Sequence, residues 1–173
     1  INFGIIDGIS AFGLARQLSV PQGEAKAYIE AYFERYPGIQ SYMEDAKAQC
    51  KKTGYVTTLF GRHIHLPTIN DKNGMRRSYA ERQAINAPIQ GSAADIIKRA
   101  MIRVPSALKR AKLDAVMLLQ VHDELLFEAP EAQVDDTIAV VKTIMEAAVG
   151  PRLSLTVPLV VDAGVGDNWN EAH

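Results

Sequence analysis

Apolar residues recur at helical spacing in several stretches of the chain. In residues 19–36 they fall at i, i+3, i+4, i+7, i+8 and i+11, which predicts a helix with one apolar face. Ser19 and Gln22 are compatible with a capping box at its start. We expect the face to be core, although an aromatic stripe also suits a base-stacking platform. It consists of Ala25, Tyr28, Ile29, Tyr32, Phe33 and Tyr36.

The same pattern predicts three further helices. One spans about 39–52, and another spans about 130–148. A third covers about 78–112 and is interrupted at 86–88, because the proline there removes a backbone donor and usually kinks or restarts a helix.

Strands are predicted between these helices. Residues 55–60 alternate like a short strand, and 61–67 follow as a polar loop. The continuous apolar run 115–121 is typical of a strand buried on both faces, with 125–129 as its antiparallel partner. A last strand near 155–165 completes the pattern. We therefore expect an α+β fold in which a small antiparallel sheet is covered by helices.

Charge is distributed unevenly along the chain, although the net charge is only −1. Residues 51–112 carry 13 basic and 3 acidic residues, whereas 113–173 carry 2 basic and 11 acidic residues. A basic block of this size favours binding to polyanions, and an acidic block can collect cations. Two solvated faces that attract each other would explain the same division.

Length and composition narrow the class of protein. A chain of 173 residues with 47% hydrophobic residues suits one folded domain or two small ones. The single cysteine, Cys50, cannot form an intramolecular disulfide and fits a reducing compartment such as the cytoplasm. No apolar run reaches the roughly 18 residues of a membrane span. Because the chain begins at Ile1 in the middle of a pattern, we expect a piece of a longer protein.

A polar group interrupts the apolar hairpin predicted above. His122, Asp123 and Glu124 occupy a turn that would normally favour Gly or Asn. Adjacent carboxylates repel each other, and a bound Mg²⁺ or Mn²⁺ would offset that cost. An exposed charged turn and a metal-dependent nuclease site remain alternatives. His63 and His65 could form a second metal pair, but a solvated or phosphate-facing loop is the simpler interpretation.

Four longer stretches carry a family signature. They are INFGIIDGIS (1–10), GYVTTLFGRHIHLP (54–67), ERQAINAPIQGSAADIIKRAM (81–101) and LLQVHDELLFEAP (118–130). Together they strongly resemble the carboxy-terminal part of the family A DNA polymerases, the bacterial DNA polymerase I-like enzymes. The resemblance covers essentially the whole chain.

The resemblance implies a right-hand polymerase architecture of palm, fingers and thumb. Residues 1–76 would form the distal, helical fingers segment, and residues 77–173 would form the carboxy-terminal half of the palm. Asp123 and Glu124 would be catalytic carboxylates that bind two Mg²⁺ ions, with Mn²⁺ as a substitute. His122 would contact the primer end.

The other site residues follow from the same resemblance. Phe3 would lie against the sugar of the incoming nucleotide, and Gly8 would let the helix end approach the template. Asn86 and Gln90 would reach the minor groove of the primer-template, where hydrogen bonds to shared acceptors test pair geometry without reading sequence. Arg82 would lie near the template backbone, and most other residues of the basic block would contact or steer phosphates.

Two departures from the family pattern stand out. Asp7 occupies a nucleotide-binding position that is ordinarily tyrosine, and a carboxylate cannot supply the stacking surface of that ring. The upstream palm aspartate, the triphosphate-binding arginine and lysine and the thumb lie outside the chain. We therefore expect impaired insertion from Asp7 and an inactive isolated fragment.

The implied reaction is template-directed, metal-dependent addition of deoxynucleotides to a primer 3′-hydroxyl. The implied partners are primer-template DNA, deoxynucleoside triphosphates and the remainder of the polymerase chain, without a membrane. A non-catalytic primer-template binding fragment is the alternative, because the basic block alone would bind duplex DNA.

Overall fold

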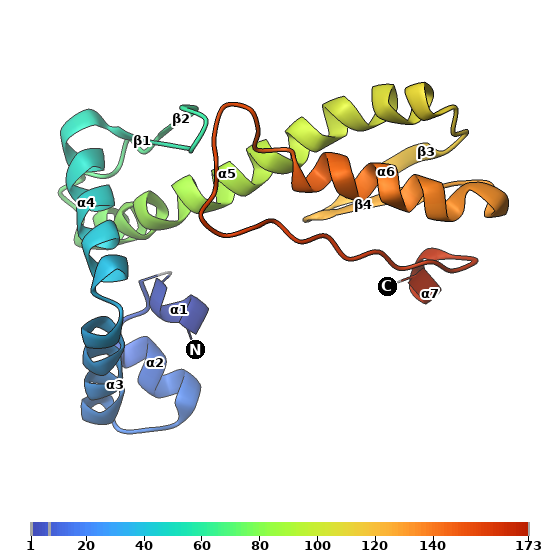
Figure 1. The fold of residues 1–173 in the computed structure, drawn as a ribbon. Coiled ribbons are helices and arrows are strands. Elements are labelled where there is room, and N and C mark those ends of the chain that lie inside the picture. Colours follow the sequence, from blue (N-terminus) through green and yellow to red (C-terminus); the bar gives the residue numbers. More distant parts are fainter. Residues whose placement is uncertain (1, 7, 173) are drawn as a thin grey trace. The chain divides into compact units, whose positions relative to one another are not determined.

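A computed structural model describes residues 2–6 and 8–172 of the chain (Figure 1). The chain divides into two compact units, Ile1–Ser92 and Ala93–His173. The predicted boundary between fingers and palm lies between residues 76 and 77. The division into compact units does not test this boundary, so it stays a prediction. Within the described residues, no helix is long and apolar enough to cross a membrane.

The first unit begins with three helices, α1 (Asn2–Ile6), α2 (Ala11–Leu18) and α3 (Gln22–Arg35). The sequence pattern did not predict α2, whose N-cap Ser10 accepts a hydrogen bond from the Gly13 amide at 3.1 Å. Ser19 ends α2 in the left-handed conformation, with φ of 57°. The predicted capping box is therefore wrong: Ser19 is a C-cap, and α3 begins after Pro21 without a side-chain cap.

The apolar face predicted for α3 is only partly core. Ala25 is buried against Leu14 and Ala15 of α2. Tyr28 and Tyr36 are 45% and 49% exposed, so the expectation that the face is core is wrong for these two residues. The reason is that α2 is too short to cover the whole length of the 14-residue α3.

The main core of the first unit lies between α4 (Pro37–Thr53), a two-stranded sheet and the start of α5. The strands β1 (Tyr55–Thr57) and β2 (His63–His65) pair antiparallel, with Val56 opposite Ile64. The predicted polar loop 61–67 is thus wrong in part, because its middle residues form β2. The core consists of Cys50, Val56, Leu66, Ile69, Ala80 and Ala84.

Helix α5 (Gly74–Ala111) is one uninterrupted helix of 38 residues. Its start is earlier than predicted, because the Asn73 side chain accepts hydrogen bonds from the amides of Met75 and Arg76. The predicted interruption at 86–88 is wrong. A proline inside a helix costs about 3 kcal/mol; Ala84 and Ile85 just before it are buried, and their burial offsets part of that cost.

The second unit contains a β-hairpin covered by helices. It comprises β3 (Val116–Val121), β4 (Glu124–Glu128), the short 3₁₀ helix η1 (Glu131–Gln133), α6 (Val134–Glu146) and α7 (Trp169–Ala172). Val104 and Leu108 of α5 pack with Val141 of α6, and Phe127 of β4 packs against them. Helices combined with two small antiparallel sheets confirm the predicted α+β class.

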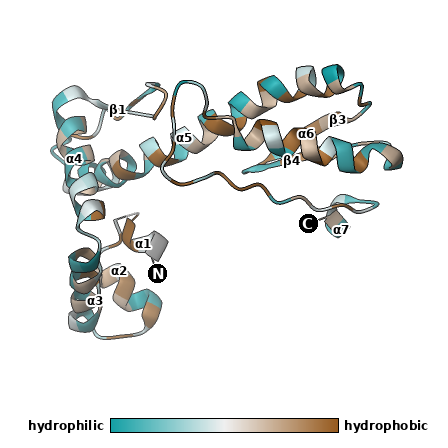
Figure 2. Ribbon diagram, in the orientation of Figure 1, coloured by the Kyte–Doolittle hydropathy of each residue, from teal (hydrophilic) through white to brown (hydrophobic). Residues whose placement is uncertain are grey.

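Two expectations about the second unit are wrong. Strand β3 is not buried on both faces, since Val116 and Leu118 are 57% and 51% exposed. Residues 155–165 form no strand, and Val157 and Val160 are 71% and 75% exposed. In Figure 2 both segments are drawn largely in the brown of hydrophobic residues. A strand needs a partner, and residues 155–165 pair with neither β3 nor β4.

Candidate functional site

The hairpin between β3 and β4 turns in two residues. Val121 pairs with Glu124, so His122 and Asp123 form the turn itself. His122 adopts a positive φ of 54°, a conformation that favours glycine and is uncommon for other residues. The Gln120 side-chain amide donates to the His122 carbonyl at 2.7 Å and supports the turn. Local strain of this kind is concentrated at functional sites.

The turn presents two carboxylates to solvent. Asp123 and Glu124 are both exposed, and their hard oxygen atoms suit Mg²⁺ or Mn²⁺. Among residues 2–6 and 8–172, however, no three His, Cys, Asp or Glu side chains are grouped to hold a metal ion. Mg²⁺ is commonly held by one or two carboxylates together with substrate phosphates. Asp123 and Glu124 therefore have the ligand chemistry for part of such a site.

Two predicted DNA-contacting residues, Gly8 and Arg82, lie side by side in the first unit. Gly8 follows α1 with φ of 81°, and a Cβ atom at this position would lie 3.4 Å from Arg82 Cγ and 3.6 Å from Ile85 Cδ1. A larger residue would be strained by its backbone and crowded by α5. Phe3 belongs to α1, whereas Asp7 lies outside the described residues.

Arg82, Asn86 and Gln90 follow one another along α5 at i, i+4 and i+8, which places them on neighbouring turns of one side. Arg82 and Gln90 are exposed. The Arg82 guanidinium lies 6.0 Å from the centre of the Tyr79 ring. Asn86 Oδ1 is buried and has no hydrogen-bond partner in the part of the chain that the structure describes. Such a group commonly marks a functional position or a water site.

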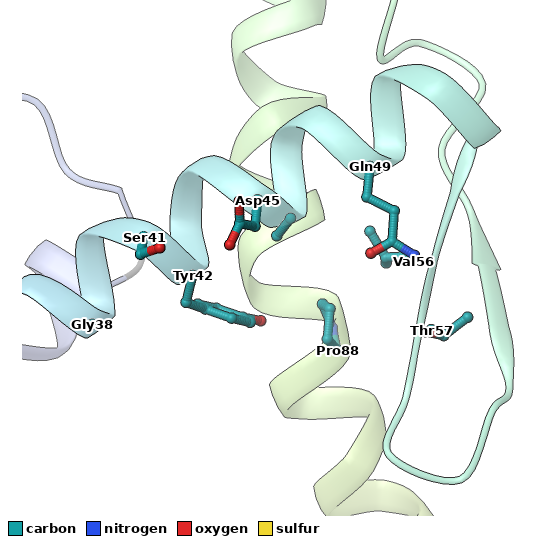
Figure 3. A pocket seen from close by; sticks show the side chains of 9 residues that line it. Gly38, Ser41, Tyr42, Asp45, Gln49, Val56, Thr57 and Pro88 are labelled. Carbon is teal, nitrogen blue, oxygen red and sulfur yellow. The ribbon is translucent and has the colours of Figure 1, made fainter.

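A shallow groove of about 450 Å³ lies between α4, β1 and α5, and Pro88 of α5 contributes to its lining (Figure 3). Tyr42 extends from α4 toward α5 near Pro88, and its hydroxyl donates to the Ile85 carbonyl at 2.8 Å. Burial raises the pKa of Tyr42 above its usual value. The sequence pattern gave Tyr42 no role, because one aromatic residue on a predicted helix does not reveal which backbone carbonyl it meets.

Part of the basic block has internal partners. Arg99 and Arg103 of α5 donate to the carbonyls at the end of α6, including Ala148 and Gly150. Lys51 forms an ion pair with Glu81 at 2.6 Å. The positive charge of residues 51–112 is therefore not all available for phosphates.

The predicted site residues fall into two groups. Gly8, Arg82, Asn86 and Gln90 belong to the first compact unit, together with the backbone of α1 that carries Phe3. The turn formed by residues 122–124 belongs to the second unit.

Comparison with known proteins gives a consistent result. Residues 1–171 match the model of DNA polymerase family A. The chain is 54% identical over its full length to DNA polymerase I of Pseudomonas aeruginosa and 56% identical to that of Rhizobium leguminosarum. It spans only 18% and 17% of those proteins.

A solved structure has the same fold. It is the polymerase domain of Pol1 from Mycobacterium smegmatis, in complex with a DNA primer-template and a deoxynucleoside triphosphate. The TM-score is 0.93 at 46% identity, and the match covers 99% of this chain and 30% of that one.

Proposed function

Because this chain belongs to DNA polymerase family A, we propose that it supplies part of the active site and of the DNA-binding surface of a template-directed DNA polymerase. The reaction is attack of a primer 3′-hydroxyl on the α-phosphate of a deoxynucleoside triphosphate, with release of pyrophosphate. The observation that carries the proposal is the two-residue turn with a left-handed His122 followed by Asp123 and Glu124. A cytoplasmic location is expected for such an enzyme.

Asp123 and Glu124 would hold Mg²⁺, or Mn²⁺ in its place, together with ligands from the remainder of the polymerase. Two such ions would activate the attacking hydroxyl and stabilise the leaving oxygen. His122 would position the primer end beside them. The protein contributes mainly orientation, because holding the reacting groups in place lowers the barrier substantially.

The first unit would hold the substrates. Asn86 and Gln90 would donate hydrogen bonds into the minor groove of the primer-template, and Arg82 would contact the template backbone. Gly8 would let the end of α1 approach the template. Phe3 would contact the sugar of the incoming nucleotide, beside Asp7.

A chimeric enzyme tests the proposal. Residues 1–173 would replace the matching segment of the P. aeruginosa polymerase, and primer extension would be measured with and without Mg²⁺. We expect Mg²⁺-dependent extension by the chimera and none by the isolated chain. Asp123→Asn should reduce the rate by several orders of magnitude, while Asp135→Asn, an exposed acidic residue of α6, should leave it unchanged. Full activity of the Asp123→Asn chimera would refute the assignment.

Asp7 can be tested in the same chimera. Asp7→Tyr should increase the rate of nucleotide insertion or its fidelity, because an aromatic ring provides a stacking surface that a carboxylate lacks. Equal rate and fidelity for the two forms would show that the departure from the family tyrosine is neutral.

Binding without catalysis is a second candidate for the isolated chain. The 13 basic residues of 51–112 favour it. Affinity for primer-template duplex should then fall steeply between 50 and 200 mM salt. Binding that does not depend on salt would contradict this candidate.

A further inference from the structure

One stretch of α5 is held at both ends by other elements of the first unit. At the amino-terminal end, the Tyr42 hydroxyl donates to the Ile85 carbonyl at 2.8 Å. At the carboxy-terminal end, Arg62 Nη2 donates to the Gly91 carbonyl at 3.0 Å, and the Leu59 amide donates to Ser92 Oγ at 2.9 Å. Asn86 and Gln90 lie between these two attachments.

The helix alone holds this stretch less firmly than an ordinary helical segment. Pro88 has no amide hydrogen, and its ring crowds the carbonyl of the preceding turn. Ser92 Oγ donates to the Pro88 carbonyl at 2.5 Å, a back-bond that often bends helices. The direction in which Asn86 and Gln90 point therefore depends on contacts from outside the helix.

Gly91 allows the loop between β1 and β2 to approach the helix closely. A Cβ atom at this position would lie 2.8 Å from Thr58 Cγ2, 2.9 Å from Ile64 Cδ1 and 3.2 Å from Arg62 Nη2. Thr58 is only 5% exposed, and its short branched side chain cannot swing away. Alanine at position 91 would therefore displace either the loop or the helix.

The loop is itself a closed unit. The Thr58 amide donates to the Arg62 carbonyl at 3.0 Å, and the Arg62 amide donates to Thr58 Oγ1 at 3.2 Å. The Gly61 amide donates to the Thr58 carbonyl at 2.9 Å. Because these bonds fix its shape, the loop can act as a rigid support rather than as a flexible connection.

We propose that Tyr42, the loop Thr58–Arg62 and Gly91 form a brace of positioning residues that determines how well the polymerase distinguishes a matched from a mismatched primer end. This inference rests on the proposed function. The brace sets where Asn86 and Gln90 meet the minor groove. Hydrogen bonds weaken steeply with distance and angle, so a displacement of a few tenths of an ångström would weaken the test of pair geometry.

The experiment uses the chimera and measures kcat/KM for extension of matched and mismatched primer ends. Gly91→Ala should lower the ratio of the two values by about three- to tenfold, as expected for the loss of about one hydrogen bond. Gly23→Ala is the matched control, since a Cβ atom on this glycine of α3 would meet nothing within 4 Å. It should leave the ratio unchanged.

Second-site variants separate positioning from general destabilisation. Thr58→Ser removes the methyl group that the new Cβ atom would meet but keeps the hydroxyl, and Ile64→Val removes Cδ1. Adding both to Gly91→Ala should restore the ratio. Tyr42→Phe, which deletes one hydroxyl at the other attachment, should lower the ratio about two- to fivefold.

The outcomes are distinct. An active chimera whose ratio is unchanged by both Gly91→Ala and Tyr42→Phe would overturn the brace while leaving the proposed function intact. Equal losses of kcat/KM on matched and mismatched ends, without rescue, would also overturn it. A chimera that is inactive both with Asp7 and with Asp7→Tyr would refute the proposed function and the brace with it.

Discussion

Replacing Arg99 and Arg103 tests how the end of α6 is held in the second unit. The Gly150 carbonyl accepts hydrogen bonds from both arginines, from Arg99 Nη2 at 3.0 Å and from Arg103 Nη2 at 2.7 Å. The Ala148 carbonyl also accepts from both, from Arg99 Nε at 2.8 Å and from Arg103 Nη1 at 3.4 Å. Each carbonyl therefore keeps one partner when a single arginine is removed.

This shared arrangement sets the magnitudes. A hydrogen bond from a charged donor contributes about 1.5–3 kcal/mol, and a buried carbonyl left without a partner costs about 1–3 kcal/mol. Arg103→Ala loses one short bond, to Gly150, and two longer ones but leaves neither Ala148 nor Gly150 without Arg99, so we expect a cost of about 1.5–3 kcal/mol, dominated by the short bond. The double alanine variant leaves both carbonyls without an arginine, so its cost should exceed the sum of the single variants by about 1–2 kcal/mol.

Hydrogen exchange of the α6 amides measures these costs as free energies of local opening. Arg110→Ala is the control, because Arg110 is exposed on the same helix and donates to Ser106 Oγ through a long bond of 3.4 Å. It should change the opening free energy by less than about 0.5 kcal/mol. If the opening free energies of the two single variants add strictly in the double variant, the idea that each arginine can hold the carbonyls when the other is absent is refuted.

Three further predictions concern the first unit. Leu14→Ala should lower the free energy of unfolding by about 2–5 kcal/mol and speed hydrogen exchange of the α2 amides, because Leu14 is 0% exposed. Phe12 is exposed, so Phe12→Ala should have little effect. Equal effects of the two variants would contradict the assigned core. Cys50 is buried and burial raises the pKa of its thiol, so labelling by a thiol reagent should be on the order of 100-fold slower in the native chain than in urea; fast native labelling would be inconsistent with this burial. Burial raises the pKa of Tyr42 above its ordinary value of 10.0, which favours the neutral hydroxyl in the folded chain. The stability from this group is complete below about pH 10 and is lost as the pH rises through the raised pKa; Tyr42→Phe should flatten that loss in urea midpoints, and an unchanged slope would argue against it.

The hydrophobic pattern predicted the long helices well and the weaker elements poorly. The helix predicted over about 78–112 is present, and Val104 and Leu108 within it are both buried. Pro88 was expected to interrupt that helix, but the rule for proline is local. The burial of neighbouring turns, which depends on tertiary contacts, decides the outcome instead.

Short strands depend on partners that a local pattern does not contain. Residues 63–65 form β2 only because the tight loop before them returns the chain alongside β1. The apolar segment 155–165 has the composition of a strand but meets no strand edge in the described residues.

The position of the hairpin turn could be predicted from the sequence, whereas the contacts that support α5 could not. His122 and Asp123 form the predicted turn and Glu124 begins β4, and a polar triplet between two apolar runs is visible in the sequence. The attachments at Tyr42 and Gly91 were not visible. They join residues that are more than twenty-five positions apart, and a backbone carbonyl that accepts a side chain leaves no signature in the sequence.

The close approach at Gly91 also restricts how related sequences can diverge. Positions 58, 64 and 91 share one small volume, so their side-chain sizes cannot drift independently. A homologue with alanine at position 91 should carry serine or another smaller residue at position 58 and a shorter side chain at position 64. Alanine at position 91 would be selected against if it arose first. The smaller residues at positions 58 and 64 are therefore expected to arise before it along a lineage.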